Sequence, residues 1–394
     1  MMVGMGYIGL DSGRLYRMRR GPKLIEAVAS GTTIIINDAT EGRPFRRLRV
    51  FGKSTQDGAP TPEAPVPIVS AGESGNITVE VRGKNLLQLQ DGRGGSRGVE
   101  VTCRNGEISL VGTATETGWT ISEVNPPFVL NGDYALSTSN DVGCYLINND
   151  YKTVISTLKP QNIVNGEVTK IAFGVTEGKI YNMNGIKVML NRGLTASPYE
   201  PPRIPQTLTL QTPNGLPGVP VSEDGNYTDA DGQQWVCDEI DLERGKYVQR
   251  IKKSLVLLKK TSHGNPDGYR YISYDVNDMH RNHTEILSDK FRYNEGAANS
   301  SGDITIRGIR VSPDFNAIVA FEKSVLPSEL IETTVYYVLA TPIERDLTPE
   351  EIAAYKALRT YGPTTVVSND AGAEMEITYR KDKKNEKTHW NKVD

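Results

Sequence analysis

The sequence predicts a mainly β protein: tandem β-sandwich domains, jelly-roll-like, with one short C-terminal helix. Gly (38) and Pro (22) are plentiful among the 394 residues, and the apolar runs between them are short. Those runs either alternate apolar and polar residues or are wholly apolar, which is typical of strands. The length allows two or three domains, each long enough to bury its own core.

Residues 1–83 are expected to form an N-terminal attachment region. Residues 32–36, an alternating stretch at 45–50 and residues 76–82 fit strands. The prolines of residues 58–67 remove backbone donors and fix φ, so they predict a semi-rigid, extended strap. A spacer is the simpler interpretation of this strap, and a ligand for a partner's aromatic groove is the alternative.

Residues 84–203 are expected to form a jelly-roll β-sandwich between this strap and a cluster of prolines. Turn pairs such as Asn105–Gly106 and Asn131–Gly132 separate short strand-like runs. The runs are residues 99–103, 107–112, 119–124, 134–137, 143–147, 171–175 and 185–190. So many short strands in one segment are typical of a sandwich.

A second β-rich domain is expected at residues 204–345. Its turn pairs Asp231–Gly232 and Arg244–Gly245 divide residues 226–250 into a β-meander. Further strands are expected at residues 208–210, 254–258, 270–274, 303–309 and 333–340, and a short helix at 327–332.

Residues 346–380 are expected to form a helix followed by a β-hairpin. Thr348, Pro349 and Glu351 provide an N-cap hydroxyl, a proline at the first helical position and a carboxylate three residues after the cap. The apolar face of this helix is formed by Ile352, Tyr355 and Leu358, and its stop signal is Gly362–Pro363. The two strands of the hairpin are residues 364–368 and 374–379. Residues 381–394 form a charged tail that cannot build a core.

Composition and charge exclude several classes of protein. Lys and Arg (45) nearly balance Asp and Glu (48), so a general phosphate-neutralising surface for nucleic acid is not expected. No apolar run is long enough to span a bilayer, and the first residues do not resemble an export signal, so membrane insertion is not expected either. The three cysteines are far apart and odd in number, and we expect them to be reduced and mostly buried.

Two groups of residues resemble metal sites, but neither has the required spacing. His280 and His283 follow Asp275 and Asp278, yet no further Cys or His completes a zinc pattern, so a polar loop is the preferred interpretation. The acidic residues around Asp229 resemble a calcium loop, whose first position would fall on a tyrosine. A hairpin turn held by Asp side chains is preferred there, and no metal or cofactor is expected.

The sequence offers little support for catalysis. It has neither a nucleophile elbow nor a phosphate-binding loop, and only four histidines. A polysaccharide depolymerase needs only two carboxylates, for which Asp238, Glu239 and Asp241 are the nearest candidates. A solvent-facing strand edge is the preferred interpretation of these residues, and we expect no enzyme activity.

Tyrosine dominates the aromatic residues, with 18 Tyr against 7 Phe and 3 Trp. Tyrosine and tryptophan present an apolar ring with a polar end, which suits contacts to sugars. Within residues 84–203, Trp119, Tyr145, Asn148 and Tyr151 fall near strand ends or loops and are the predicted glycan contacts. For Trp119 and Tyr145 taken one at a time, a packing role is the preferred interpretation.

Several stretches together resemble one family. They are LRVFGKSTQDG at 48–58 running into TPEAPVP at 61–67, KNLL at 84–87, LVGTA at 110–114, VMLN at 188–191, SPYEP at 197–201, residues 226–250, YYVLATPIE at 336–344, LTPEE at 347–351 and NDAG at 369–372. They resemble tail and baseplate structural proteins of phages and prophages of Gram-positive bacteria. The resemblance covers most of residues 48–379, whereas residues 1–30 match nothing in that family.

The resemblance implies a virion component of the distal tail, assembled in the host cytoplasm, whose central segment resembles jelly-roll carbohydrate-binding modules. Its implied partners are other tail or baseplate proteins and host cell-surface polysaccharide. A homotrimer is the expected state, and a hexameric ring is the alternative. The resemblance carries over no catalytic residue. Three functions remain open: a glycan-binding adhesin, a purely structural scaffold, and a polysaccharide depolymerase.

Overall fold

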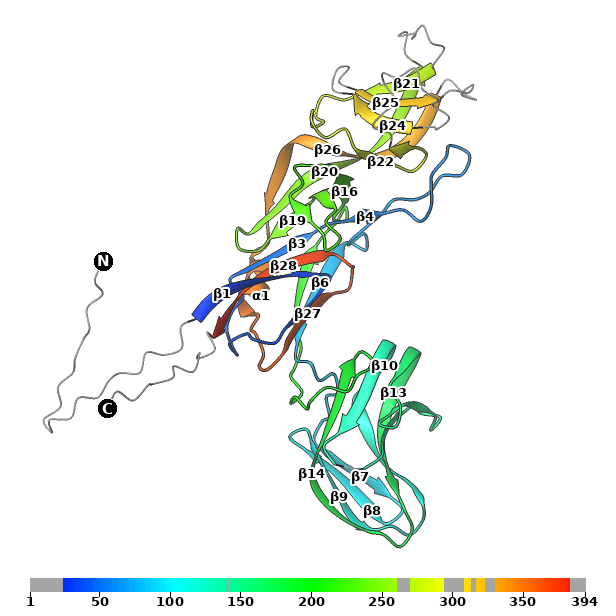
Figure 1. Cartoon of the computed structure of the whole chain (residues 1–394), viewed down its shortest axis with the longest axis vertical. Coiled ribbons are helices and arrows are strands. Elements are labelled where there is room, and N and C mark those ends of the chain that lie inside the picture. Colours follow the sequence, from blue (N-terminus) through cyan, green and yellow to red (C-terminus); the bar gives the residue numbers. More distant parts are fainter. Residues whose placement is uncertain are drawn as a thin grey trace, which may run out of the picture.

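The computed structural model describes residues 24–140, 142–260, 270–293, 308–312, 317–322 and 330–382. These residues form antiparallel sheets, apart from one parallel strand pair, and contain a single α-helix, as the composition predicted. They divide into a base (residues 24–83, 204–251 and 338–382), an inserted sandwich (residues 84–203) and a distal part (the described residues of 252–337). Figure 1 shows the base between the other two. Among the described residues, no helix has the length and apolar character needed to cross a bilayer.

The base consists of two sheets that pack face to face. One is a four-stranded sheet with the order β15-β6-β27-β2, and the other is the lower part of an eleven-stranded sheet that begins β1-β28-β3-β19-β20. The strands are β1 (Leu24–Gly31), β2 (Thr33–Ile36), β3 (Arg47–Phe51), β6 (Asn76–Arg82), β15 (Gln206–Gln211), β19 (Glu239–Asp241), β20 (Lys246–Lys260), β26 (Leu330–Asp346), β27 (Thr365–Asn369) and β28 (Glu374–Asp382). Two smaller sheets complete the base: β4 (Ser54–Thr55) with β5 (Val69–Ser70), and β16 (Gly218–Val221) with β17 (Tyr227–Thr228) and β18 (Gln234–Cys237).

Alternating apolar residues hold the two sheets of the base together. Ile77, Val79 and Val81 on β6 and Leu48 and Val50 on β3 are fully buried in one core. The residues between them are more exposed, since successive side chains of a strand point to opposite faces. The helix α1 (Pro349–Ala357) packs against β15 and closes the base at one side.

The inserted sandwich leaves and re-enters the base between two neighbouring strands. β6 and β15 pair antiparallel, and Val81 lies opposite Gln206. The ends of the insertion are fixed locally: Gln88 donates to the carbonyl of Arg203, and Asn85 donates to the carbonyl of Glu200. Residues 84–203 therefore form an insertion between the two strands of a hairpin.

The inserted sandwich contains one curled sheet with its own core. The strand order is β12-β11-β13-β10-β14-β9-β8-β7, which is not a simple meander because β13 and β14 flank β10. The strands are β7 (Gly92–Ser96), β8 (Val99–Arg104), β9 (Glu107–Thr113), β10 (Gly118–Thr138), β11 (Cys144–Ile147), β12 (Thr153–Ser156), β13 (Gln161–Val175) and β14 (Ile180–Arg192). Side chains such as Leu110, Leu146 and Phe173 fill the space inside the curl.

The distal part extends the hairpin formed by β20 and β26. A bulge between Gln249 and Ile251 interrupts this pair where it leaves the base. The remaining strands are β21 (Arg270–Asp275), β22 (Ile286–Ser288), β23 (Arg292–Tyr293), β24 (Gly308–Ser312) and β25 (Ala317–Glu322). A separate core that includes Phe291, Val335 and Tyr337 lies here.

The structure divides the chain differently from the expected domains. Strands from residues 1–83, 204–345 and 346–380 share the sheets of the base, for example β6 between β15 and β27. Their separation along the sequence is misleading because long-range antiparallel pairing joins them. The strap at 58–67 connects β4 to β5, and the amide of Val66 donates to the carbonyl of Asp289.

Three local expectations need correction, and a fourth, the strand at 303–309, lies mostly outside the described residues. Asn131–Gly132 is not a turn: it lies inside the single strand β10, where the pairing with β13 shifts register between Leu130 and Gly132 and skips Asn131. Of the helix expected at 327–332, residues 330–332 begin β26, and the others lie outside the described residues. The helix α1 ends at Ala357, before the expected stop at Gly362–Pro363. The strand expected at 303–309 is described only from residue 308, where β24 begins.

Candidate functional site

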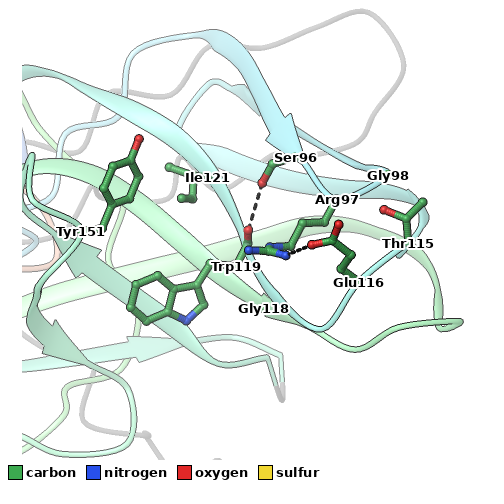
Figure 2. A pocket seen from close by; sticks show the side chains of 9 residues that line it. All are labelled: Ser96, Arg97, Gly98, Thr115, Glu116, Gly118, Trp119, Ile121 and Tyr151. Atoms are coloured by element: carbon green, nitrogen blue, oxygen red, sulfur yellow. Dashed lines mark hydrogen bonds and ion pairs between the residues drawn. The ribbon is translucent and has the colours of Figure 1, made fainter.

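An open cavity of about 710 Å³ lies on the outside of the inserted sandwich. Figure 2 shows the rings of Trp119 and Tyr151 toward one end of it and the charged groups of Arg97 and Glu116 toward the other. The complete lining is Ser96, Arg97, Gly98, Thr115, Glu116, Gly118, Trp119, Ile121 and Tyr151. The strand β10, the β7–β8 turn, the β9–β10 loop and the β11–β12 loop thus contribute to one concave surface.

Trp119 is placed by the pairing of β10 with β13. It lies opposite Gly174, while Tyr145 of the neighbouring strand β11 lies opposite Ala172. These two small residues on β13 leave room for the larger side chains on either side. The ring centroids of Trp119 and Tyr145 are 5.2 Å apart, and both side chains are half-buried. The two rings form an aromatic surface that packs on the sheet and remains accessible.

Tyr151 is presented by a tight loop between β11 and β12, and Asn148 holds that loop. The Asn148 side chain accepts from the Lys152 amide at 2.9 Å, and its carbonyl accepts from the Tyr151 amide at 3.1 Å. Tyr151 is 57% exposed, and the Lys170 ammonium lies 5.5 Å from its ring centroid. The loop therefore holds an exposed aromatic ring at the edge of the cavity.

Lys170 is buried and fully engaged beneath this loop. Its ammonium donates to Asn149 at 2.9 Å and lies 3.6 Å from the Glu123 carboxylate. With these partners and the Tyr151 ring, Lys170 braces the loop.

Arg97 and Glu116 form an ion pair at the opposite end of the cavity. Arg97 and Gly98 are the two residues of the turn from β7 to β8, and both have positive φ, 54° and 75°. Such two-residue turns match the twist of the strands that they join. Gly118 allows the guanidinium to lie against β10, since a Cβ there would be 2.7 Å from Arg97 Nε.

Arg97 and Tyr151 share an unusual backbone conformation. Five non-glycine residues have positive φ among the described residues, and three of them are Asn or Asp. Those residue types tolerate this conformation, whereas a bulky side chain in it raises the free energy of the folded chain. The remaining two, Arg97 and Tyr151 at 54° and 60°, both line this cavity. Strain of this kind concentrates at functional sites, so it supports a binding role for the cavity.

The predicted glycan contacts have different places in this arrangement. Trp119 and Tyr151 line the cavity, Tyr145 packs beside Trp119 outside the lining, and Asn148 acts through the loop that presents Tyr151. Sequence reasoning missed Arg97 and Glu116. A local indication of Arg97 was present in GRGGSRGV at residues 92–99, where glycines surround an arginine between two strand-like runs.

The acidic residues after Cys237 are not a solvent-facing strand edge, which corrects the expectation. Asp238, Glu239 and Asp241 are 1%, 4% and 1% exposed. Their burial follows from the position of β19 between β3 and β20, in the middle of a sheet. Arg250 pairs with Glu239 at 3.0 Å, and Arg47 pairs with Asp241 at 2.8 Å.

A second cavity of about 440 Å³ lies in the base beside Asp238. The amides of Arg250 and Ile251 donate to one Asp238 oxygen at 2.7 and 2.8 Å, and the Tyr247 hydroxyl donates to the other at 2.9 Å. Burial nevertheless raises the pKa of Asp238 to about 7. These bonds place Asp238 at the bulge of β20, where it satisfies backbone donors that the bulge leaves free.

The residues that resembled metal sites serve other contacts. The described residues contain no group of three or more His, Cys, Asp or Glu side chains that could hold a metal ion. Asp229 holds a hairpin turn, as expected, by accepting from the amides of Asp231 and Gln233. Hydrogen bonds from the Trp235 indole and the Lys53 ammonium lower the pKa of Asp229 to about 2.

The three cysteines are free and buried, as expected. Burial raises the pKa of the Cys144 and Cys237 thiols, so neither is an activated nucleophile.

No family model matches this chain, and no curated protein or solved structure matches it either.

Proposed function

We propose that this chain is a glycan-binding component of a phage tail tip or baseplate, without enzyme activity, and that its inserted sandwich recognises host-surface polysaccharide. One observation carries the proposal: a single open cavity combines two accessible aromatic rings, Trp119 and Tyr151, with the Arg97–Glu116 ion pair. Ligand sites typically combine apolar walls with a few fixed polar groups.

The chemistry of the cavity suits a sugar ring. A pyranose has an apolar face of C–H groups, which can lie on an indole or phenol ring, and a rim of hydroxyls. Arg97 offers donors and Glu116 offers acceptors for those hydroxyls. The cavity is open at the surface, which allows a long polymer to pass through it.

The tail context rests on the sequence resemblance and is supported by the shape of the chain. The inserted sandwich projects from the base, at the opposite end from the distal part (Figure 1). Such a shape leaves the base available for other tail or baseplate proteins while the sandwich faces outward. Single sugar sites bind weakly, and a homotrimer or hexameric ring would add avidity.

The binding test uses purified full-length protein of known oligomeric state with host cells and extracted wall polysaccharide. We expect saturable binding, and we expect Trp119→Ala to weaken it by about tenfold because the stacking surface is lost. The matched control is Tyr199→Ala, an aromatic residue of the same sandwich outside the cavity lining. Equal binding by wild type and Trp119→Ala would contradict the proposed site.

A purely structural role is the second candidate, and the edges of the base favour it. The β15 edge is protected, because the Gln211 amide donates to Glu351 at 2.8 Å and the Gln211 carbonyl accepts from Arg345 at 3.0 Å. At the other side, β1 and β2 end their sheets, with Val28 and Ile35 59% exposed or more. Exposed apolar residues on a strand at the edge of a sheet favour pairing with another chain. Absence of glycan binding by a folded oligomer would support this role.

The depolymerase alternative is tested in the same samples by assaying reducing-sugar release. The candidate carboxylates Asp238, Glu239 and Asp241 are each engaged in hydrogen bonds or ion pairs inside the base. We expect no sugar release from wild-type protein. Release that is lost in Asp238→Asn would contradict the assignment as a non-enzymatic protein.

A further inference from the structure

We infer that the cavity takes an uncharged sugar unit with adjacent hydroxyls, and that Glu116 determines this preference. The inference rests on the proposed glycan binding and goes further by naming the ligand class. A neutral unit lies against Trp119 and bridges Arg97 and Glu116 through two neighbouring hydroxyls. Anionic wall polymers, such as those with phosphodiester or uronate groups, are excluded.

The lining of the cavity contains one charge of each sign. Among the lining residues, Arg97 is the one cation and Glu116 the one anion, and they are paired with each other. The Glu116 side chain is 69% exposed and the Arg97 side chain 37%, so the carboxylate is the more accessible charge. Any anionic group that approaches Arg97 must also approach Glu116, and like charges in contact oppose binding.

Lys170, whose ammonium lies 5.5 Å from the ring centroid of the lining residue Tyr151, does not change this balance. Lys170 is buried, donates to Asn149 and pairs with Glu123. Its positive charge is therefore compensated by the Glu123 carboxylate. The lining of the cavity consequently contains no unpaired cation of the kind that recognises a phosphate or carboxylate.

The position of Arg97 is fixed by its turn and by the neighbouring strand β10. The turn holds the Arg97 backbone, and Gly118 gives its guanidinium a place against β10. The Ser96 hydroxyl donates to the Trp119 carbonyl at 2.9 Å, which ties the turn to the strand that carries the ring. The guanidinium donors are thus held beside a stacking surface, and the Glu116 carboxylate is paired with them, as Figure 2 shows. Pre-organised groups lose little conformational entropy on binding.

Adjacent hydroxyls match this pair chemically. Each hydroxyl donates one hydrogen bond and accepts others, so one can accept from the guanidinium while its neighbour donates to the carboxylate. Hydrogen bonds to charged groups are stronger than those between neutral groups. A neutral diol therefore binds without disturbing the charge balance, whereas an anion would have to displace Glu116 from Arg97.

The experiment compares two probes with the full-length oligomer. Wall polysaccharide from a strain that the protein binds is separated by anion exchange into a neutral and an anionic fraction, and affinity for each is measured at low and high NaCl. The variants are Glu116→Gln, Trp119→Ala and the control Glu167→Gln, an exposed carboxylate on β13 outside the lining. Thermal unfolding shows that each variant is folded.

We expect binding to the neutral fraction that does not change with salt. We expect Glu116→Gln to weaken it by about tenfold through loss of the charged acceptor, with Glu167→Gln unchanged. The inference is overturned if binding is confined to the anionic fraction and falls with salt, or if Glu116→Gln binds as tightly as wild type or more tightly. In those cases, if Trp119→Ala still loses binding, the further inference fails but the proposal that this cavity binds glycan is retained. Binding of neither fraction by wild type, or undiminished binding by Trp119→Ala, overturns the proposed function itself.

Discussion

At the scale of single residues, the positive φ angles of Arg97 and Tyr151 connect the backbone to the candidate site. Both have positive φ without being Gly, Asn or Asp, and both line the same cavity. A conformation of this kind costs of the order of 1 kcal/mol or more for an ordinary side chain. The chain therefore gives up stability at two points in order to present a guanidinium and a phenol ring at one surface.

Arg97→Asn is expected to raise the free energy of unfolding by about 1 kcal/mol, because asparagine tolerates the left-handed turn position better. Urea denaturation measures the change. The control is Arg93→Asn on the same strand, β7, which has ordinary backbone and pairs with Glu100 only at the surface. A stability loss in Arg97→Asn larger than in Arg93→Asn would show that the positive φ is not a cost. The same variant should bind glycan less well.

Asp238 is the second residue with a measurable consequence. Its pKa is raised to about 7 in the folded protein, against 3.8 for an ordinary Asp, chiefly through burial. The folded state thus holds the proton more tightly than the unfolded state. The stabilisation is complete below pH 3.8 and is lost as the pH rises through about 7.

Asp238→Asn is expected to remove that part of the pH dependence. An asparagine oxygen can still accept from the amides of Arg250 and Ile251, and its amide can donate to Tyr247. Wild-type stability should therefore fall between pH 4 and pH 7 relative to that of the variant, as followed by urea midpoints across this range. Parallel curves for the two proteins would contradict the assignment.

At the scale of elements, α1 is the one whose sequence and structure agree most closely. The Thr348 side chain accepts from the Glu351 amide at 3.2 Å, and Glu351 accepts from the Thr348 amide at 2.8 Å. Tyr355 and Leu358 are buried in the core of the base. The same Glu351 also accepts from the Gln211 amide, so the cap of the helix protects the edge strand β15 as well.

Thr348→Ala is expected to lower the free energy of unfolding of the base by about 1 kcal/mol, since the first turn loses its side-chain acceptor. Thr348→Ser, which keeps the hydroxyl, should remain close to wild type. Guanidinium denaturation of both variants provides the comparison. Equal losses in the two would assign the effect to the lost methyl group instead of the cap.

At the scale of the whole molecule, the base is a single sandwich whose hairpins have been extended. Residues 84–203 leave from β6 and return to its neighbour β15, and the distal part extends the β20–β26 hairpin. Each extension has a core of its own. Domain insertion is tolerated where the two ends of the inserted segment lie close together.

Replacing residues 84–203 by a two-residue Asn-Gly turn is expected to leave the base folded, because β6 and β15 already pair as an antiparallel hairpin. Residues 84–203 expressed alone should fold cooperatively around their own core and should carry the glycan binding. Circular dichroism and thermal unfolding of both products test this. An unfolded base would show that the two cores depend on each other.

The sequence by itself determined the local features of this protein. Alternation of apolar residues predicted β6, and the spacing of Thr348, Pro349 and Glu351 predicted the start of α1. These features depend on residues that are neighbours along the chain, so the sequence contains all the information they need. The same holds for the turn at Asp229, whose side chain bonds to its own loop.

Only the tertiary structure decided which segments share a sheet and which residues share a site. The burial of Asp238, Glu239 and Asp241 follows from β3 lying beside β19, and these strands are far apart in sequence. The cavity likewise joins Arg97, Trp119 and Tyr151, which come from three separate segments. Long-range antiparallel pairing brings such residues together, and the pattern of apolar residues within one segment does not show which other segment pairs with it.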